Sequence, residues 1–293
     1  MDLFRTLLFI PGNSPKMLQK GLTLPADALV PDLEDSVPPD EKANAQATVE
    51  EFLPSMAGNR VFVRVNGLQT EWTWADLKAV VSPHIDGISI GKMESAEMAR
   101  ELSALLSVLE RERGLPDGHT KIIPWIETGK GVANVREIAE ATPRMVGLAF
   151  GAEDYTADLG ITRTKGSEEI ATARALVAIA ARVAEVVAYD TPDPDFNDIE
   201  NLVIDSKRAR AVGYKGKFVI HPNQIGPVND VFRPSDEEIG HAQRIIEAFE
   251  QAKARGTAAV ALDGKMVDTP VWKRAVKVLE LAEALERQEA AKG

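Results

Sequence analysis

The chain contains no cysteine among its 293 residues. This absence excludes disulfide frameworks, thiolate zinc sites and cysteine nucleophiles, and it fits a cytoplasmic protein. Basic residues are also outnumbered, with 34 Lys and Arg against 45 Asp and Glu, which gives a formal net charge of −11. A surface of that sign repels nucleic acid and anionic membranes, so we expect neither as a main partner.

Long hydrophobic runs are absent as well. The N-terminal stretch MDLFRTLLFIPGN has an acid at position 2 and is stopped by Pro11 and Gly12, so we expect neither a membrane span nor a signal peptide. Apolar residues make up 44% of the chain and charged residues 27%, as in an ordinary globular enzyme. The length allows one sizeable core, with or without a small appendage.

Eight short apolar runs bounded by turn residues recur along the chain, with helical patterns between them. We expect strands within 6–11, 27–35, 60–67, 85–93, 121–128, 144–154, 183–192 and 216–224. Eight βα units predict a (β/α)8 TIM barrel. An open doubly wound sheet is disfavoured, because no G-x-G-x-x-G loop follows the first run.

The domain prediction follows from the same pattern. We expect a TIM-barrel catalytic domain over 1–235 and a C-terminal helical extension over 236–293, built from a helix, a hairpin-like link and a terminal helix.

Polar side chains end almost every expected strand. They are Asp32, Glu34, Asp35, Arg64, Asn66, Lys92, Glu94, Glu127, Glu153, Asp154, Asp190 and His221. Each one alone is more often a helix cap or a rim ion pair than a catalytic group. Their joint placement at the carboxyl ends of barrel strands favours an active site. Carboxylates with no Cys and few His suit Mg²⁺ or Mn²⁺ better than zinc.

Two basic residues of this set suggest different chemistry. Lys92 could form a Schiff base, as in metal-independent aldolases, or be a structural cation among the acids, which Glu94 nearby favours. Arg64 cannot be a base, but its planar fork suits a carboxylate or an enolate oxygen. We expect His221 to have a structural role, or to support the site from behind, at the end of the eighth run. We expect Glu153 to point away from Asp154, because neighbours leave a strand on opposite sides.

Seven ordered motifs carry a family resemblance. They are LLFIPGNSPKMLQK, DLEDSVPPDEKA, VFVRVNGL, WIETGKGV, GLAFGAEDYTADLG, GKFVIHPNQI and LDGKMVD. Together they resemble the citrate lyase β-subunit-like proteins of the HpcH/HpaI aldolase superfamily, whose relatives include malyl-CoA and citramalyl-CoA lyases. The resemblance runs from about residue 3 to residue 285. It implies a Mg²⁺-dependent TIM barrel that assembles into a homotrimer or hexamer.

The resemblance also implies roles for individual residues. Glu127 of IET and Asp154 of GAED would bind the metal, and Glu127 would also contact substrate. Arg64 of VRVNG matches the substrate-binding arginine. Asp268 of KMVD matches an acid/base aspartate that the C-terminal segment delivers to a neighbouring subunit, although its own sequence context predicts a helix N-cap.

For the CoA thioester, Phe9 and Lys20 match two of the family's binding residues. Ser14 stands where relatives have an arginine, which puts the hold on the CoA phosphates in doubt. We expect Asp32, Glu34, Asp35 and Lys92 to orient the metal's waters and the arginine.

The activity implied is cleavage of a 3-hydroxy-3-carboxyacyl-CoA, of the citramalyl-CoA or malyl-CoA type, into an acyl-CoA and an α-keto acid. Three alternatives stay open. They are a citrate lyase β subunit that acts on citryl-acyl carrier protein, a Schiff-base aldolase that uses Lys92, and a non-catalytic assembly subunit.

Overall fold

The computed structural model describes residues 3–290. The chain forms two compact units, the first ending at Asn229 and the second beginning at Asp230. Within 3–290, no helix is both apolar enough and long enough to cross a lipid bilayer.

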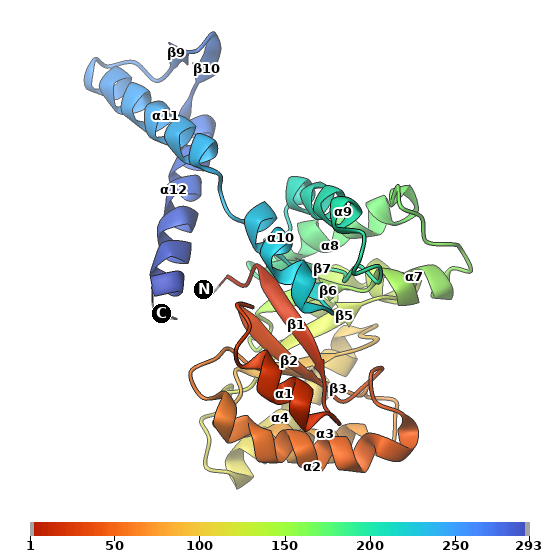
Figure 1. Cartoon of the computed structure of the whole chain (residues 1–293). Helices are drawn as coiled ribbons and strands as arrows, with labels where there is room; N and C mark the ends of the chain where they lie inside the picture. Colours follow the sequence, from red (N-terminus) through yellow and green to blue (C-terminus); the bar gives the residue numbers. More distant parts are fainter. Residues whose placement is uncertain (1–2, 291–293) are drawn as a thin grey trace. The chain divides into compact units, whose positions relative to one another are not determined.

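The first unit is a closed barrel of eight parallel strands in sequential order (Figure 1). The strands are β1 (Thr6–Pro11), β2 (Ala28–Asp32), β3 (Phe62–Val65), β4 (Gly87–Ile90), β5 (Lys121–Ile126), β6 (Gly147–Phe150), β7 (Val187–Asp190) and β8 (Gly216–Val219). Strand β8 pairs with β1 and closes the barrel. The predicted TIM barrel is confirmed, and each expected run contains one strand.

Helices connect the strands and surround the barrel (Figure 1). They are α1 (Pro15–Gly21), α2 (Lys42–Phe52), α3 (Thr73–Val80), α4 (Ala96–Glu112), α5 (Gly129–Ala133), α6 (Val135–Ala139), α7 (Ala152–Asp158), α8 (Ala171–Val183), α9 (Ile199–Val212) and α10 (Pro222–Phe232). Short 3₁₀ turns lie at Pro39–Glu41, Leu53–Met56 and Glu168–Ile170. Helix α4 shows why these boundaries form: the Ser95 side chain accepts the Met98 N–H at its start, and Gly114 turns the chain at positive φ after its end.

Alternate residues of the strands fill the barrel interior. This core includes Leu7, Ala28, Val30, Phe62, Ile123, Trp125, Ala149, Val187, Tyr189 and Phe218. The same alternation, carried one step beyond Val30, Phe62 and Trp125, reaches Asp32, Arg64 and Glu127. The pleat therefore directs these three polar side chains into the carboxyl-end mouth of the barrel.

Strands β7 and β8 carry a buried ionic network on their outer side. The Lys217 ammonium lies 2.5 Å from Asp190 and 3.0 Å from Asp205, and Arg174 pairs with both acids. Ser167, at φ 61° in the loop before α8, donates its hydroxyl to Asp205. Two positive and two negative side chains thus neutralise each other between the sheet and helices α8 and α9.

The second unit is a helical hairpin with a small sheet. It consists of α11 (Asp236–Ala254), the antiparallel strands β9 (Val260–Leu262) and β10 (Lys265–Val267), and α12 (Thr269–Ala290). Ser235 and Glu238 form a capping box at the start of α11. The apolar faces of α11 and α12 bury Ala242, Ile245, Phe249 and Ala275 against each other and Val267.

Candidate active site

A cleft of about 390 Å³ opens at the carboxyl ends of the barrel strands. Its lining joins residues of β1, β2, β3 and β5, and residues that directly follow β2, β5, β7 and β8, to the first turn of α7. Phe9 and Trp125 form an aromatic floor, with their ring centres 5.7 Å apart. Above the floor the walls are charged, which makes this the polar end of an otherwise apolar barrel.

Arg64 is held in this cleft by acids on the neighbouring strand. Its Nε and Nη2 donate to the two oxygens of Asp32, both at 2.6 Å, and its Nη1 donates to Asp35 at 2.9 Å. The guanidinium lies 4.4 Å from the centre of the Phe9 ring. Burial alone would raise the pKa of Asp32, but Arg64 holds it below its usual value. The arginine is thus fixed in place and remains cationic.

Glu127 immediately follows β5 and is 7% exposed. Its Oε1 accepts the backbone N–H of Lys92 at 2.7 Å. Burial, and then the nearby Asp154 charge, raises its pKa to about 8. A Cβ on Gly151 would lie 2.4 Å from Glu127 Oε2 and 2.6 Å from its Cβ, so only glycine leaves room for this side chain.

Asp154 lies in the first turn of α7, whose N-cap is Gly151. The Lys92 ammonium is 3.4 Å from Asp154 Oδ1. Lys92 has a positive φ of 52°, and from this conformation its N–H contacts Glu127 while its side chain reaches Asp154. Glu127 and Asp154 therefore face one cleft from consecutive βα units.

The sequence analysis separated Glu153 from Asp154 by strand alternation, and that reason is wrong. Glu153 and Asp154 are in helix α7, not at the end of a strand, so strand alternation does not separate them. Glu153 instead forms an ion pair with Arg163 at 3.4 Å. Glu153 therefore differs from Asp154 because it pairs with a residue of the following loop, and not because of alternation along a strand.

Thr191 is a cleft residue that the sequence analysis missed. Its hydroxyl oxygen accepts the N–H of Ala152 at 3.1 Å, which fixes the first turn of α7 next to Asp154. Thr191 lies two residues after the inward-facing Tyr189, so counting alternate positions past the core would have identified it. The same count shows why Asp190 does not reach the cleft: it points outward, into the buried network with Arg174 and Lys217.

Glu34 is a second acid beside the site, and its side chain is half-buried. Its Oε2 lies 3.4 Å from Arg64 Nη1, and burial raises its pKa to about 7 in spite of that contact. Lys42 donates to the backbone oxygens of Leu33 and Glu34 and to Asn66 Oδ1. These bonds hold the loop after β2, and with it Glu34 and Asp35, against the arginine.

Other residues singled out in the sequence lie away from the cleft lining. Lys20 is exposed in the last turn of α1, and Ser14 begins that helix without a side-chain cap bond. The His221 ring stacks on Phe196 with centres 4.7 Å apart, and the structural role expected for His221 stays a prediction. In the second unit, Asp268 Oδ1 accepts the N–H of Val271, so Asp268 caps α12.

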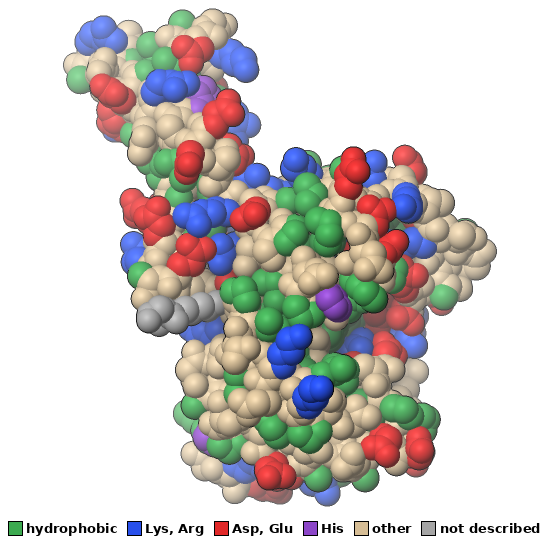
Figure 2. Space-filling model, in the orientation of Figure 1, with side chains coloured by type: hydrophobic (Ala, Val, Ile, Leu, Met, Phe, Trp, Pro, Cys, Tyr) green, Lys and Arg blue, Asp and Glu red, His purple; other side chains and the backbone are tan. Residues whose placement is uncertain are grey.

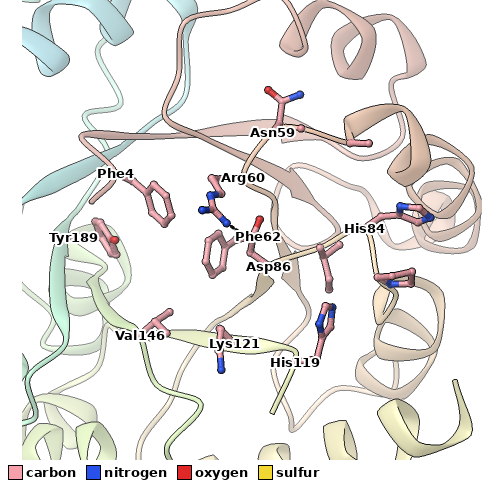
Figure 3. Close-up of a pocket in the computed structure, with 14 residues that line it drawn as sticks. Phe4, Asn59, Arg60, Phe62, His84, Asp86, His119, Lys121, Val146 and Tyr189 are labelled. Atoms are coloured by element: carbon pink, nitrogen blue, oxygen red, sulfur yellow. Dashed lines mark hydrogen bonds and ion pairs between the residues drawn. The ribbon is translucent and has the colours of Figure 1, made fainter. Parts of the chain in front are cut away.

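A larger hollow of about 550 Å³ lies at the opposite, amino end of the strands (Figure 3). Phe4, Phe62 and Tyr189 project into it from the barrel interior (Figure 3). Its polar groups are engaged within the protein: Arg60 donates to Asp86, and Lys121 donates to the Gly118 carbonyl. In TIM barrels this face serves stability, so we place the active site at the carboxyl end despite the smaller volume there.

Comparison with known proteins identifies the family. Residues 5–222 match the family model described as HpcH/HpaI aldolase/citrate lyase. The chain belongs to this family. It is 40% identical to citrate lyase subunit beta of Leuconostoc mesenteroides subsp. cremoris, over 96% of this chain and 94% of the relative. It is 33% identical to an L-malyl-CoA/beta-methylmalyl-CoA lyase of Cereibacter sphaeroides, over 96% and 95% of the two chains.

Solved structures agree with this assignment. CitE from Mycobacterium tuberculosis, in complex with magnesium, acetoacetate and coenzyme A, superposes with a TM-score of 0.79 at 29% identity. The match covers 96% of this chain and 98% of the other. The family and fold expected from the motifs are both confirmed, and membership places the chain among lyases.

The donor set fits a hard divalent cation. Glu127 and Asp154 could offer a cation oxygen ligands only, and burial together with the nearby Asp154 carboxylate raises the pKa of Glu127, an environment that a cation would relieve. Among residues 3–290, His, Asp and Glu side chains form no cluster of three that could hold a metal. Two protein carboxylates would leave the other coordination positions of a bound Mg²⁺ to water and substrate oxygens, the arrangement that Mg²⁺ prefers.

Proposed function

We propose that the chain is a Mg²⁺-dependent carbon–carbon lyase that cleaves a 3-hydroxy-3-carboxyacyl-CoA into an acyl-CoA and an α-keto acid. Citramalyl-CoA or malyl-CoA is the proposed substrate type. The observation that carries this proposal is the convergence of Glu127, Asp154 and Arg64 on one cleft at the carboxyl end of the barrel. The relatives named for citrate and malyl-CoA lyases, and the CitE complex with magnesium and coenzyme A, support it.

In this proposal Glu127 and Asp154 hold the metal, with Mn²⁺ as a substitute. When bound, Mg²⁺ would polarise the substrate's hydroxyl and carboxylate oxygens and lower the pKa of the hydroxyl. Loss of that proton to solvent allows the adjacent carbon–carbon bond to break: the hydroxyl carbon becomes the keto carbon of the α-keto acid, and the bonding electrons pass to an acyl-CoA enolate, whose negative charge lies on the thioester oxygen. The Arg64 guanidinium, fixed by Asp32, donates hydrogen bonds to that oxygen.

The released acyl carbon must then be protonated, and Asp268 of a neighbouring subunit is proposed as the acid. This makes the enzyme a homo-oligomer, a trimer or hexamer, with shared active sites. The N-cap bond to Val271 would orient the carboxyl group while leaving one oxygen for the reaction. Mixing Asp268→Ala with Arg64→Ala chains tests this, because only shared sites recover activity upon subunit exchange.

Phe9 and Lys20 remain the proposed contacts for CoA. Phe9 lies in the cleft floor, whereas Lys20 is exposed on α1 and would meet the phosphates outside it. Asp35 and Glu34 are proposed to support Arg64 and the metal's waters.

The second candidate is a citrate lyase β subunit that acts on citryl-acyl carrier protein. The 40% identity to such a subunit favours it, as does Ser14 in place of an arginine in the loop that would bind CoA. A Schiff-base aldolase is disfavoured: burial lowers the pKa of Lys92, but the carboxylates of Asp154, Glu127 and Glu34 together raise it, and the net shift is upward.

A coupled lyase assay with Mg²⁺ tests the proposal. It compares citramalyl-CoA, malyl-CoA, citryl-CoA and citryl-acyl carrier protein, each with wild type and with Glu127→Ala. Turnover of a CoA thioester that is lost in Glu127→Ala and in EDTA supports the first candidate. Full activity in EDTA, with borohydride trapping on Lys92, would overturn the metal-dependent mechanism.

A further inference from the structure

Lys92 follows strand β4 and contacts both carboxylates proposed to hold the metal. Its backbone N–H donates to Glu127 Oε1 at 2.7 Å, and its ammonium lies 3.4 Å from Asp154 Oδ1. The positive φ of 52° at Lys92 makes the two contacts compatible. The Lys92 side chain is 61% exposed, so it can leave Asp154 without disturbing the packed barrel. One residue therefore holds one acid through its fixed backbone and the other through a movable side chain.

Acidic side chains are crowded beside Lys92. A Cβ on Gly91 would lie 2.7 Å from Glu34 Oε1 and 3.0 Å from Glu127 Oε1, so these two carboxylates flank one backbone position. Asp154 is close enough for its charge to act on Glu127 as well. Like charges at such short range repel each other unless a positive group lies between or beside them.

The other cation of the cleft is already engaged. Arg64 pairs with both oxygens of Asp32, each at 2.6 Å. In the described part of the chain, Asp154 forms an ion pair only with Lys92. Lys92 is therefore the positive partner of the proposed metal ligands, as Arg64 is the positive partner of the acid that ends β2.

We propose that the Lys92 ammonium competes with the divalent cation for Asp154, so that metal binding displaces this side chain and Lys92 sets the metal affinity. The inference rests on the proposed function, because it takes Glu127 and Asp154 as the metal ligands. A cation held by both acids would come close to an ammonium that is 3.4 Å from Asp154, and two positive charges at short range repel. The ammonium leaves, while the backbone contact of Lys92 continues to orient Glu127.

Isothermal titration with Mg²⁺ compares the wild type with Lys92→Met and Lys92→Arg. Methionine keeps an unbranched side chain and the backbone N–H, and removes only the charge. We expect Lys92→Met to bind Mg²⁺ about 5-fold more tightly, as the loss of one exposed ion pair implies. Lys92→Arg retains the charge and should bind like the wild type. If Lys92→Met binds Mg²⁺ no more tightly than the wild type, the inference is overturned.

Lys130→Met is the matched control. Lys130 is 65% exposed and lies 3.2 Å from Glu94 Oε2, so its ion pair resembles that of Lys92 but involves no proposed metal ligand. Both variants lose one positive charge from a chain of net charge −11. Side chains of both signs are spread over the face drawn in Figure 2, so losing one surface lysine should change the general field little. An equal gain in affinity in Lys130→Met would show a general charge effect and overturn the role of Lys92.

The displacement itself can be followed by NMR after the lysines are converted to isotope-labelled dimethyl-lysines, which keep their positive charge. The resonance of Lys92 is identified by its absence in Lys92→Arg. We expect it to shift during titration with Mg²⁺, with the midpoint found by calorimetry, and the Lys130 resonance to stay in place. Binding of Mg²⁺ without a change in the Lys92 resonance would contradict displacement.

Glu127→Ala separates a failure of this inference from a failure of the proposed function. If the wild type binds Mg²⁺ and Glu127→Ala does not, the metal site is correct, and the Lys92 variants alone decide the inference. If the wild type binds no Mg²⁺, or Glu127→Ala binds it equally well, the proposed metal site and the inference both fail. Circular dichroism on each variant identifies a lost fold.

Discussion

Arg64 and Asp32 lie in register on β3 and β2, and their side chains form a two-pronged ion pair with both N–O distances at 2.6 Å. The pair faces the cleft that contains Glu127. Fixing a guanidinium before substrate arrives reduces the reorganisation needed when charge develops on the reacting oxygen.

Asp32→Asn should lower lyase activity about 10- to 100-fold, because Arg64 loses the charged partner that orients it. Asp35→Asn is the matched control: Asp35 is largely exposed and contacts only Nη1, so we expect a smaller loss. Steady-state kinetics on the thioester that the wild type cleaves provide the measurement. Equal losses in both variants would show that Asp32 has no special role in holding the arginine.

The pH dependence of stability should differ with and without Mg²⁺. In the metal-free protein the folded pKa values of Glu34 and Glu127 are about 7 and about 8, against an ordinary 4.5. The folded state therefore holds these protons more tightly, and this contribution to stability is lost as pH rises through 7 and 8. Mg²⁺ requires ionised Glu127, so the rise in Tm upon adding Mg²⁺ should grow from about pH 6 to about pH 9.

Thermal melts across this pH range, with and without Mg²⁺, check that prediction. Glu127→Gln should remove most of the Mg²⁺-dependent rise in Tm. A rise of the same size at both ends of the range would contradict the assignment of Glu127 as a metal ligand.

Thr191→Val should weaken Mg²⁺ binding about 10-fold, because the Ala152 N–H loses its acceptor and the first turn of α7 shifts Asp154. Thr191→Ser retains the oxygen and should restore binding. Isothermal titration with Mg²⁺ measures both variants. If Thr191→Ser binds as weakly as Thr191→Val, the methyl packing rather than the hydrogen bond positions α7.

Asp205→Ala should lower the free energy of unfolding by about 3–5 kcal/mol, since it leaves Arg174 and Lys217 with one acid between them in a buried site. Arg100→Ala breaks an exposed ion pair with Glu97 and should cost less than about 1 kcal/mol. Urea unfolding followed by circular dichroism compares the two. A similar small cost in both would mean that water or a rearranged side chain compensates the buried charges.

The barrel could be predicted from the sequence, because few folds other than a (β/α)8 barrel accommodate eight short apolar runs that alternate with helical segments. The residues that line the cleft could be predicted only in part. An apolar run in the sequence shows where a strand ends, but it does not show which side chains face the barrel interior. Asp190 and Thr191 are adjacent, yet one is buried outside the sheet and the other lines the cleft. Continuing the alternation of core residues such as Tyr189 resolves this, but only once the strand's register is known.

The sequence suggested Lys92 as a cation among acids, but the particular partners of Lys92 and Glu153 could not be predicted from it. Lys92 reaches both proposed metal ligands through a left-handed backbone conformation, which local composition does not reveal in a lysine. Glu153 is distinguished from Asp154 by a partner ten residues later in the chain, Arg163. Both depend on loop paths that periodicity does not determine.

Gly151 has a negative φ, so its backbone conformation is open to any residue. The space beside it is not, because the Glu127 side chain fills the position of a Cβ. From the sequence alone, Gly151→Ala would look like a mild change to a loop glycine. Its consequence would be that of an active-site substitution, because the displaced atom belongs to the carboxylate proposed to bind the metal.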